Sequence, residues 1–127
     1  MASILIVDDS SAMRSVIKRI IKLSGFEMET CVEAGDGEDA LAVLRSQPVD
    51  MVISDINMPR MDGETLLREI AADQNLCGTP VVIVSSDATE SRASRLLELG
   101  AGAYLVKPFQ PQALREKLEQ LMEGAHG

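Results

Sequence analysis

The chain alternates between short runs of consecutive hydrophobic residues and longer segments in which hydrophobic residues recur every three or four positions. The runs are residues 4–7, 51–53, 81–84 and 103–106. Continuous hydrophobic runs of this length are typical of parallel strands that are covered on both faces. A fifth segment, Glu27–Glu33, alternates instead, with Met28, Thr30 and Val32 on one side. It predicts a half-exposed strand at the edge of the sheet.

Helical patterns separate these strands and follow the last one. Their hydrophobic positions are Met13, Val16, Ile17, Ile20 and Ile21; Ala40, Leu41 and Leu44; Leu66, Leu67 and Ile70; Ala93, Leu96 and Leu97; and Leu114, Leu118, Leu121 and Met122. This spacing forms one apolar stripe on each helix. Ser10 or Ser11 predicts the start of the first helix and Gly25 its end. Gly100 closes the fourth helix, and Pro111 suits the first turn of the fifth.

Five strand–helix pairs in strict alternation predict an α/β fold, with a mostly parallel sheet and right-handed crossovers. Five pairs are too few for an eight-stranded barrel, so we expect an open, doubly wound sheet with helices on both faces. If the second strand lies at the edge, the strand order is 2-1-3-4-5. The length of 127 residues fits one domain, which we place at residues 1–123, with a flexible C-terminal tail at 124–127.

Composition and charge narrow the range of possible functions. Hydrophobic residues make up 46% and charged residues 25%, as in ordinary soluble domains. The net charge of −8 disfavours binding to nucleic acid or to an anionic membrane surface. No apolar run approaches the roughly 18 residues that span a bilayer, and the N-terminus lacks the basic region of a signal peptide. Cys31 and Cys77 form no metal motif and read as reduced thiols. We therefore expect a cytoplasmic protein.

Polar residues gather where the predicted strands end. Asp8 and Asp9 follow the first strand, Asp55 the third, Ser85 the fourth and Lys107 the fifth. In open α/β sheets, ligands bind beyond the carboxyl ends of the strands, where the strand order reverses. Three carboxylates this close stay ionised only if a cation lies among them; otherwise some are protonated. Carboxylate oxygens with an open coordination sphere suit Mg²⁺, and a nearby lysine suits a phosphoryl group.

Four segments together carry a recognisable signature. They are Ile6-Val7-Asp8-Asp9, Ser54-Asp55-Ile56-Asn57-Met58-Pro59-Arg60-Met61-Asp62-Gly63, Val84-Ser85-Ser86 and Lys107-Pro108-Phe109. In this order and spacing, the chain resembles the receiver domains of two-component response regulators, most of all the single-domain chemotaxis-like type. The resemblance runs from Ile4 to Met122 and implies a flavodoxin-like sheet of order 2-1-3-4-5.

The resemblance also implies a Mg²⁺-dependent phosphorylation site. Asp55 is then the phosphoacceptor, which receives a phosphoryl group from a histidine kinase. Asp8 and Asp9 hold the metal together with Asp55 and the backbone carbonyl of Asn57. Lys107 contacts the phosphoryl group and forms a cis peptide bond with Pro108.

A switch follows from the same resemblance. Ser85 supplies the hydroxyl that moves to the phosphoryl oxygens. At this position the family more commonly has threonine. Tyr104 is the aromatic residue that turns inward with it, although a core-filling role for this side chain fits equally well. The family exposes the region Ala88 to Met122 to downstream target proteins. These expectations describe a signalling switch that catalyses only its own phosphorylation and dephosphorylation.

Two other functions need residues that this sequence does not have at the relevant positions. A phosphatase with an aspartate nucleophile needs a general acid two residues after the nucleophile, and Asn57 occupies that place. A flavodoxin-like electron carrier needs a phosphate loop rich in hydroxyl groups and glycine after the first strand, where Asp8-Asp9-Ser10-Ser11 stands. The phosphatase is the stronger of the two alternatives to the signalling switch.

Overall fold

The computed structural model describes residues 2–126, with side chains described through residue 123, as five strands that alternate with five helices. In chain order they are β1 (Ala2–Val7), α1 (Ser11–Ser24), β2 (Met28–Ala34), α2 (Gly37–Ser46), β3 (Met51–Ser54), α3 (Gly63–Ala72), β4 (Val81–Ser85), α4 (Glu90–Glu98), β5 (Ala103–Val106) and α5 (Pro111–His126). The alternation predicted from the hydrophobic pattern is confirmed.

The strands form one parallel sheet in the order β2-β1-β3-β4-β5. This order confirms the prediction and makes β1 and β3 neighbours, with Ile4 paired to Met51 and Val7 paired to Ser54. From β1 the chain forms β2 on one side, and it then crosses to form β3, β4 and β5 on the other. The strand order therefore reverses at the β1–β3 seam.

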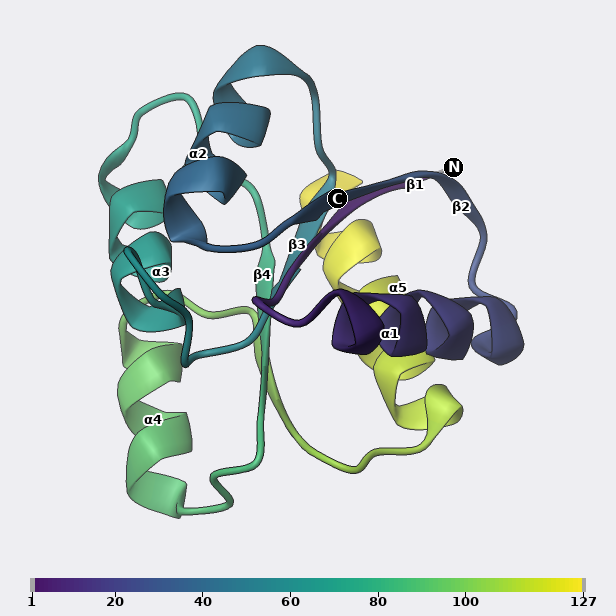
Figure 1. Ribbon diagram of the computed structural model, residues 1–127. Coiled ribbons are helices and arrows are strands. Elements are labelled where there is room, and N and C mark those ends of the chain that lie inside the picture. The colour runs from purple at the N-terminus through teal and green to yellow at the C-terminus, as the bar shows by residue number, and fades with distance from the viewer. Residues whose placement is uncertain (1, 127) are drawn as a thin grey trace.

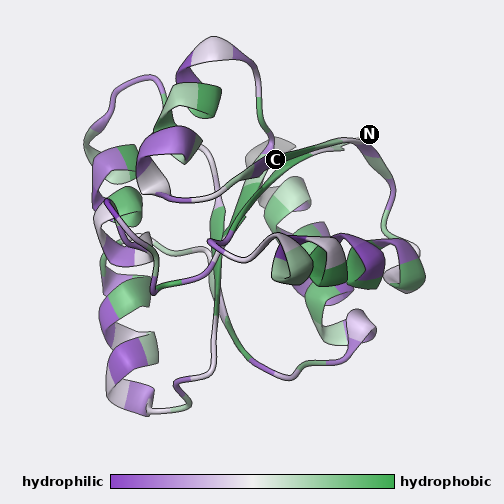
Figure 2. Cartoon of the chain, in the orientation of Figure 1, coloured by the Kyte–Doolittle hydropathy of each residue, from purple (hydrophilic) through white to green (hydrophobic). Residues whose placement is uncertain are grey.

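Helices cover both faces of the sheet, and a hydrophobic layer lies under each group. Helices α2, α3 and α4 pack on one face and α1 and α5 on the other (Figure 1). The central strands are green along their length in Figure 2, whereas the helices carry green and purple on opposite sides. Ile4, Leu5, Ile6 and Val7 of β1 are all fully buried, because successive side chains enter alternate layers.

The edge strand β2 departs from its predicted pattern. Met28 and Cys31 pack in the layer beneath α1 and α5, Val32 packs in the layer beneath α2 to α4, and Thr30 is exposed. The prediction that Met28, Thr30 and Val32 share one side is therefore wrong. The pairing of β1 with β2 shifts register between Ala2 and Ser3, and an extra residue on one strand reverses the side on which later residues fall.

The helix ends agree with the predicted caps. Ser10, rather than Ser11, caps α1: its side chain accepts a hydrogen bond from the backbone N–H of Met13. Gly25 ends this helix in the left-handed conformation, with φ of 82°. Helix α5 continues through His126, so the backbone of residues 124–126 is helical where the sequence predicted a flexible tail. The last residue of that predicted tail lies outside the described residues. Within residues 2–126, no helix has the length and apolar character needed to cross a membrane.

Candidate functional site

The sheet brings two acidic segments together at the seam where its order reverses. Asp55 directly follows β3, and its backbone N–H donates to the carbonyl of Val7 at 3.0 Å. Asp8 directly follows β1, and its backbone N–H donates to the carbonyl of Ala34, at the end of β2, at 3.1 Å. Parallel pairing thus continues one residue beyond each strand and fixes both aspartates at the same edge.

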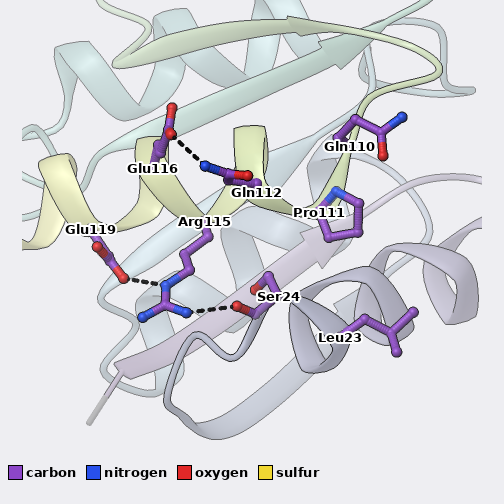
Figure 3. A pocket seen from close by; sticks show the side chains of 8 residues that line it. All are labelled: Leu23, Ser24, Gln110, Pro111, Gln112, Arg115, Glu116 and Glu119. Carbon is purple, nitrogen blue, oxygen red and sulfur yellow. Dashed lines mark hydrogen bonds and ion pairs between the residues drawn. The ribbon is translucent and has the colours of Figure 1, made fainter.

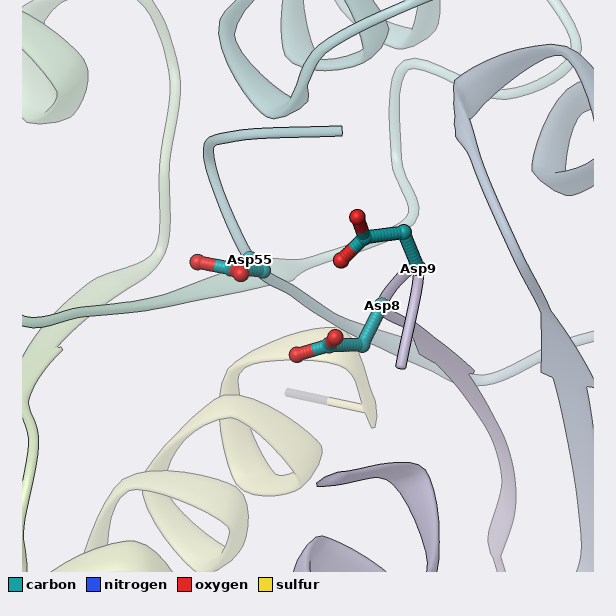
Figure 4. Close-up of side chains that lie close together, drawn as sticks. All are labelled: Asp8, Asp9 and Asp55. Atoms are coloured by element: carbon teal, nitrogen blue, oxygen red, sulfur yellow. The ribbon is translucent and has the colours of Figure 1, made fainter. Parts of the chain in front are cut away.

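Three carboxylates meet at this edge. Asp8, Asp9 and Asp55 each offer an oxygen, and these oxygens lie within 4.8 Å of one another. Asp8 and Asp9 enter from the end of β1 and Asp55 from the end of β3 (Figure 4). Asp8 is buried, Asp55 is half-buried and Asp9 is exposed, so the cluster opens to solvent on one side. The convergence expected from the strand ends is therefore observed.

Burial dominates the electrostatics of Asp8. Burial raises the pKa of the Asp8 carboxyl, and the neighbouring charge of Asp55 raises it further, against the lowering effect of a hydrogen bond from the Ser10 N–H and of Lys107. Asp8 Oδ1 accepts that bond at 2.9 Å. Asp8 Oδ2 is buried without a hydrogen-bond partner among the described residues. A buried carboxylate oxygen without a partner is unfavourable, and a bound cation would stabilise it.

Lys107 is the cation closest to the cluster among the ion pairs of the described residues. Its Nζ lies 3.8 Å from Asp8 Oδ2 and 3.7 Å from Asp55 Oδ2, beyond hydrogen-bond distance in both cases. The residue directly follows β5, and its backbone N–H donates to the carbonyl of Ser85 at 2.8 Å. The peptide bond between Lys107 and Pro108 is cis, as the resemblance implied.

The donor set fits a magnesium ion. Carboxylate oxygens from two strand ends, one of them unpartnered, match the hard ligands that Mg²⁺ prefers, and the exposed side leaves room for water and a phosphate oxygen. Among the residues whose side chains the structure describes, neither histidine nor cysteine, the ligands that favour zinc, joins this cluster. The residues present thus support the class of ion that the sequence predicted.

The loop after Asp55 is fixed by a close backbone contact. Asp55 Oδ1 accepts a hydrogen bond from the Ile56 N–H at 2.8 Å, and the Gly63 N–H donates to the carbonyl of Ile56 at 2.7 Å. A Cβ atom on Gly63 would lie only 2.1 Å from the carbonyl oxygen of Asp55. Glycine is therefore required where α3 begins, because its missing side chain lets this helix approach the backbone of Asp55.

Ser85 and Tyr104 both form hydrogen bonds with the backbone of Asp87. Ser85, at the end of β4, is buried, and its Oγ accepts a hydrogen bond from the Asp87 N–H at 3.1 Å. The Tyr104 hydroxyl donates to the carbonyl of Asp87 at 2.5 Å, and its ring packs against the layer beneath α2 to α4. The core contact and the polar contact of Tyr104 therefore coexist. Asp87 also accepts bonds from the Thr89 N–H and hydroxyl, immediately before α4.

Asn57 is exposed in the loop that follows Asp55. The role of its carbonyl as a metal ligand stays a prediction. The contacts of two arginines were missed from the sequence. Arg14 donates to the backbone carbonyl of Asp8, and Arg60 adopts a left-handed conformation, with φ of 61°, and pairs with buried Asp36 at 2.6 Å. No spacing rule signals such contacts, because each partner comes from a different element.

A hollow lies away from the carboxylates. It has a volume of about 650 Å³ and lies between the end of α1 and the start of α5 (Figure 3). Some of its polar side chains are paired within the protein: Arg115 pairs with Glu119 and also donates to the carbonyl of Ser24. None of the predicted site residues lines this hollow.

The fold and this site define a class of protein. The family model of the response regulator receiver domain matches residues 4–119, and the chain belongs to this family. It is 41% identical to the chemotaxis protein CheY of Pseudomonas aeruginosa over 124 residues, which cover 98% of both chains. It is 39% identical to the chemotaxis protein CheY-3 of Vibrio cholerae over 120 residues, covering 94% of this chain and 91% of that protein.

Solved structures agree with these relatives. The chemotaxis response regulator CheY4 of Vibrio cholerae superposes with a TM-score of 0.81 at 31% identity, covering 95% of this chain and 98% of that one. The receiver domain of the Francisella response regulator 1452 superposes with a TM-score of 0.84 at 29% identity, covering 98% of each chain. The predicted resemblance to chemotaxis-like receivers is confirmed. The phosphatase alternative finds no support in these comparisons.

Proposed function

We propose that this protein is a phosphorylation-activated signalling switch, in which Asp55 accepts a phosphoryl group in a Mg²⁺-dependent reaction. The observation that carries the proposal is the meeting of Asp8, Asp9 and Asp55 within 4.8 Å, with the Lys107 ammonium beside two of them. Receiver domains are the class of protein to which the chain belongs, and in two-component systems a histidine kinase is the phosphodonor.

The chemistry is an in-line displacement at phosphorus. A carboxylate oxygen of Asp55 forms the new bond to phosphorus, while the bond to the imidazole nitrogen of the phosphohistidine breaks and that nitrogen keeps the electron pair. Asp55 is partly accessible, with 19% of its side chain exposed, so a donor can reach it from the open side of the cluster. Lys107 supplies positive charge to the phosphoryl oxygens on the same side.

Asp8, Asp9 and Asp55 would hold the metal ion, together with the carbonyl of Asn57. When bound, Mg²⁺ neutralises charge on the transferring phosphoryl group. The residues themselves supply the rest of the site. Asp8 offers the buried oxygen that has no other partner among the described residues, and the hydrogen bond from Ile56 orients the Asp55 carboxylate.

Ser85 and Tyr104 connect the phosphorylation site to a distant surface. The Asp87 peptide segment receives the Tyr104 hydroxyl on its carbonyl and gives its N–H to Ser85. If the Ser85 hydroxyl moves to a phosphoryl oxygen, the Asp87 N–H loses its acceptor, and the segment before α4 must rearrange. Phosphorylation then biases a two-state surface formed by α4, β5 and α5.

A histidine kinase and a downstream target protein are the partners we infer. The target surface is the region Ala88 to Met122, where Leu97 is 47% exposed and Val106 is 36% exposed. The acidic net charge of −8 favours a protein partner over nucleic acid or an anionic membrane. We place this exchange in the cytoplasm, and the only reaction we assign to the chain is the gain and loss of its own phosphoryl group.

Incubation with Mg²⁺ and a small acyl phosphate tests the phosphoacceptor. We expect the intact mass to rise by one phosphoryl group, and borohydride reduction to mark Asp55 in the peptide map. Asp55→Asn should abolish the increase, and so should EDTA. Asp62→Asn is the matched control, because asparagine still caps α3 and the loop is otherwise unchanged. Equal phosphorylation of the Asp55→Asn variant would refute the assignment.

The switch needs a separate measurement. In amide NMR spectra, phosphorylation should shift resonances of α4 and β5 as well as those around Asp55. Ser85→Ala should keep the phosphorylation but lose the distant shifts. Alanine has no hydroxyl group that could move from the Asp87 N–H to the phosphoryl group. Distant shifts of full size in that variant would exclude Ser85 as the switch.

A further inference from the structure

We propose that Arg14 is a positioning residue of the metal site, which sets the geometry of Asp8 and Asp9 through the backbone between them. The inference rests on the proposed Mg²⁺ site and concerns a residue that makes no contact with the ion. Arg14 lies in the first part of α1, and its guanidinium reaches back to the end of β1.

The guanidinium joins three elements. Arg14 Nη1 donates to the carbonyl oxygen of Asp8 at 2.6 Å, and Arg14 Nε donates to Glu33 Oε1, on β2, at 2.9 Å. The Arg14 side chain is 19% exposed and that of Glu33 is 39% exposed. A partly buried guanidinium with two acceptors in different directions is held in one orientation, because its donors lie in a rigid plane.

The hydrogen bond to the Asp8 carbonyl is the contact through which Arg14 affects both aspartates. The carbonyl belongs to the peptide plane that links Asp8 to Asp9, the two carboxylates supplied by this loop. The Asp8 N–H is already fixed by the carbonyl of Ala34 at 3.1 Å. With Arg14 on the carbonyl, the backbone is held on both sides of Asp8, and a planar peptide transmits that constraint to Asp9. Groups that orient metal ligands in this way typically change metal affinity by about 10–100-fold when they are removed.

Charge alone predicts the opposite effect. Arg14 is a cation near a site for a divalent cation, so its positive charge opposes metal binding. If Arg14 acted only through its charge, removing that charge would strengthen Mg²⁺ binding. If Arg14 positions the loop, its removal weakens binding. The sign of the change in affinity therefore separates the two roles.

Calorimetric titration of Mg²⁺ into the purified protein makes the test. Arg14→Gln should raise the Mg²⁺ dissociation constant by about tenfold or more. Arg14→Lys keeps the charge and one donor direction but cannot span both acceptors, so its affinity should fall between those of the wild type and Arg14→Gln. Arg19→Gln removes an exposed charge from the same helix and serves as the control, with an affinity equal to or slightly tighter than the wild type.

Further measurements exclude a purely structural role. Circular dichroism in EDTA establishes that each variant is folded at the temperature of the titration. Raising the Mg²⁺ concentration should restore the phosphorylation of Arg14→Gln toward the wild-type rate, because only the occupancy of the site has changed.

Two results would overturn the inference. One is a folded Arg14→Gln protein that binds Mg²⁺ as tightly as Arg19→Gln or more tightly. If Arg14→Gln does not fold, unchanged affinity in Arg14→Lys has the same consequence. A wild-type protein that binds no Mg²⁺ would instead refute the proposed function, and this inference with it.

Discussion

Replacing Asp8 with asparagine should stabilise the metal-free protein and abolish its stabilisation by Mg²⁺. Asparagine has nearly the same shape as aspartate, and its Oδ1 can still accept the hydrogen bond from the Ser10 N–H. The substitution therefore removes mainly the negative charge. In the wild type that charge is buried, and its Oδ2 atom has no hydrogen-bond partner among the described residues.

The size of the effect follows from the distances. At an effective dielectric of about 20, two carboxylates repel each other by about 3.5 kcal/mol when their oxygens are 4.8 Å apart, which is the outer limit for the pairs in this cluster. Asp8 faces two such neighbours, whereas Lys107 at 3.8 Å returns about 4.4 kcal/mol on the same scale. The remaining repulsion is about 2.5 kcal/mol, and solvent around exposed Asp9 reduces it further. We expect Asp8→Asn to raise the free energy of unfolding by about 1–2 kcal/mol at pH 7 in EDTA.

The stability difference between the wild type and Asp8→Asn should depend on pH. The pKa of Asp8 is raised in the folded protein, chiefly by burial, so the folded state binds a proton more readily than the unfolded state. The wild type therefore loses stability as the pH rises through the folded pKa of Asp8. The advantage of Asp8→Asn should be full above that pKa and should vanish below the ordinary aspartate value, about 3.9, where Asp8 is neutral in both states.

Urea unfolding followed by far-ultraviolet circular dichroism measures these differences, since the chain has no tryptophan to report by fluorescence. With saturating Mg²⁺ the order should reverse, because the ion binds only the folded wild type and stabilises it by mass action. Glu98→Gln removes an exposed carboxylate from α4 and should change neither result. A destabilised Asp8→Asn protein in EDTA, or one that Mg²⁺ stabilises as much as the wild type, would refute the reasoning.

Other predictions address the surroundings of the site. Gly63→Ala should lower the free energy of unfolding by at least about 2 kcal/mol in urea unfolding, since the new Cβ meets the Asp55 carbonyl, whereas Gly78→Ala, with no atom within 4 Å of its added Cβ, should have little effect. Asp36→Asn should be less stable than the wild type at pH 7. Hydrogen bonds from the backbone and pairing with Arg60 lower the pKa of Asp36, so the difference should shrink as the pH falls below about 4; a constant difference would contradict this. Tyr104→Phe loses the hydrogen bond to Asp87 and should cost about 1 kcal/mol in the same assay.

The sequence predicted the sheet and the place of the site because both depend on local patterns. Continuous apolar runs located the central strands, and the polar residue after each run was enough to bring Asp8, Asp55 and Lys107 to one edge. The edge strand was harder, because a register shift in its pairing reverses the inward side, and one alternating segment does not reveal such a shift.

Contacts that depend on tertiary position could not be predicted from spacing. Arg14 and Glu33 lie 19 residues apart, and Arg60 reaches Asp36 across 24 residues. Their meeting depends on how α1 and the loop after β3 lie against the sheet. The close approach of Gly63 to Asp55 is similar: the glycine was visible in the motif, but its reason is a backbone contact that only the packing of α3 creates.

A crystal structure grown with Mn²⁺, located by its anomalous scattering, tests the central claim most directly. We expect one ion that shares carboxylate oxygens from the end of β1 and from Asp55, with the Lys107 ammonium beside the site and outside the coordination sphere. Saturating Mn²⁺ that leaves this edge of the sheet without an ion, or that binds without touching Asp55, would contradict it.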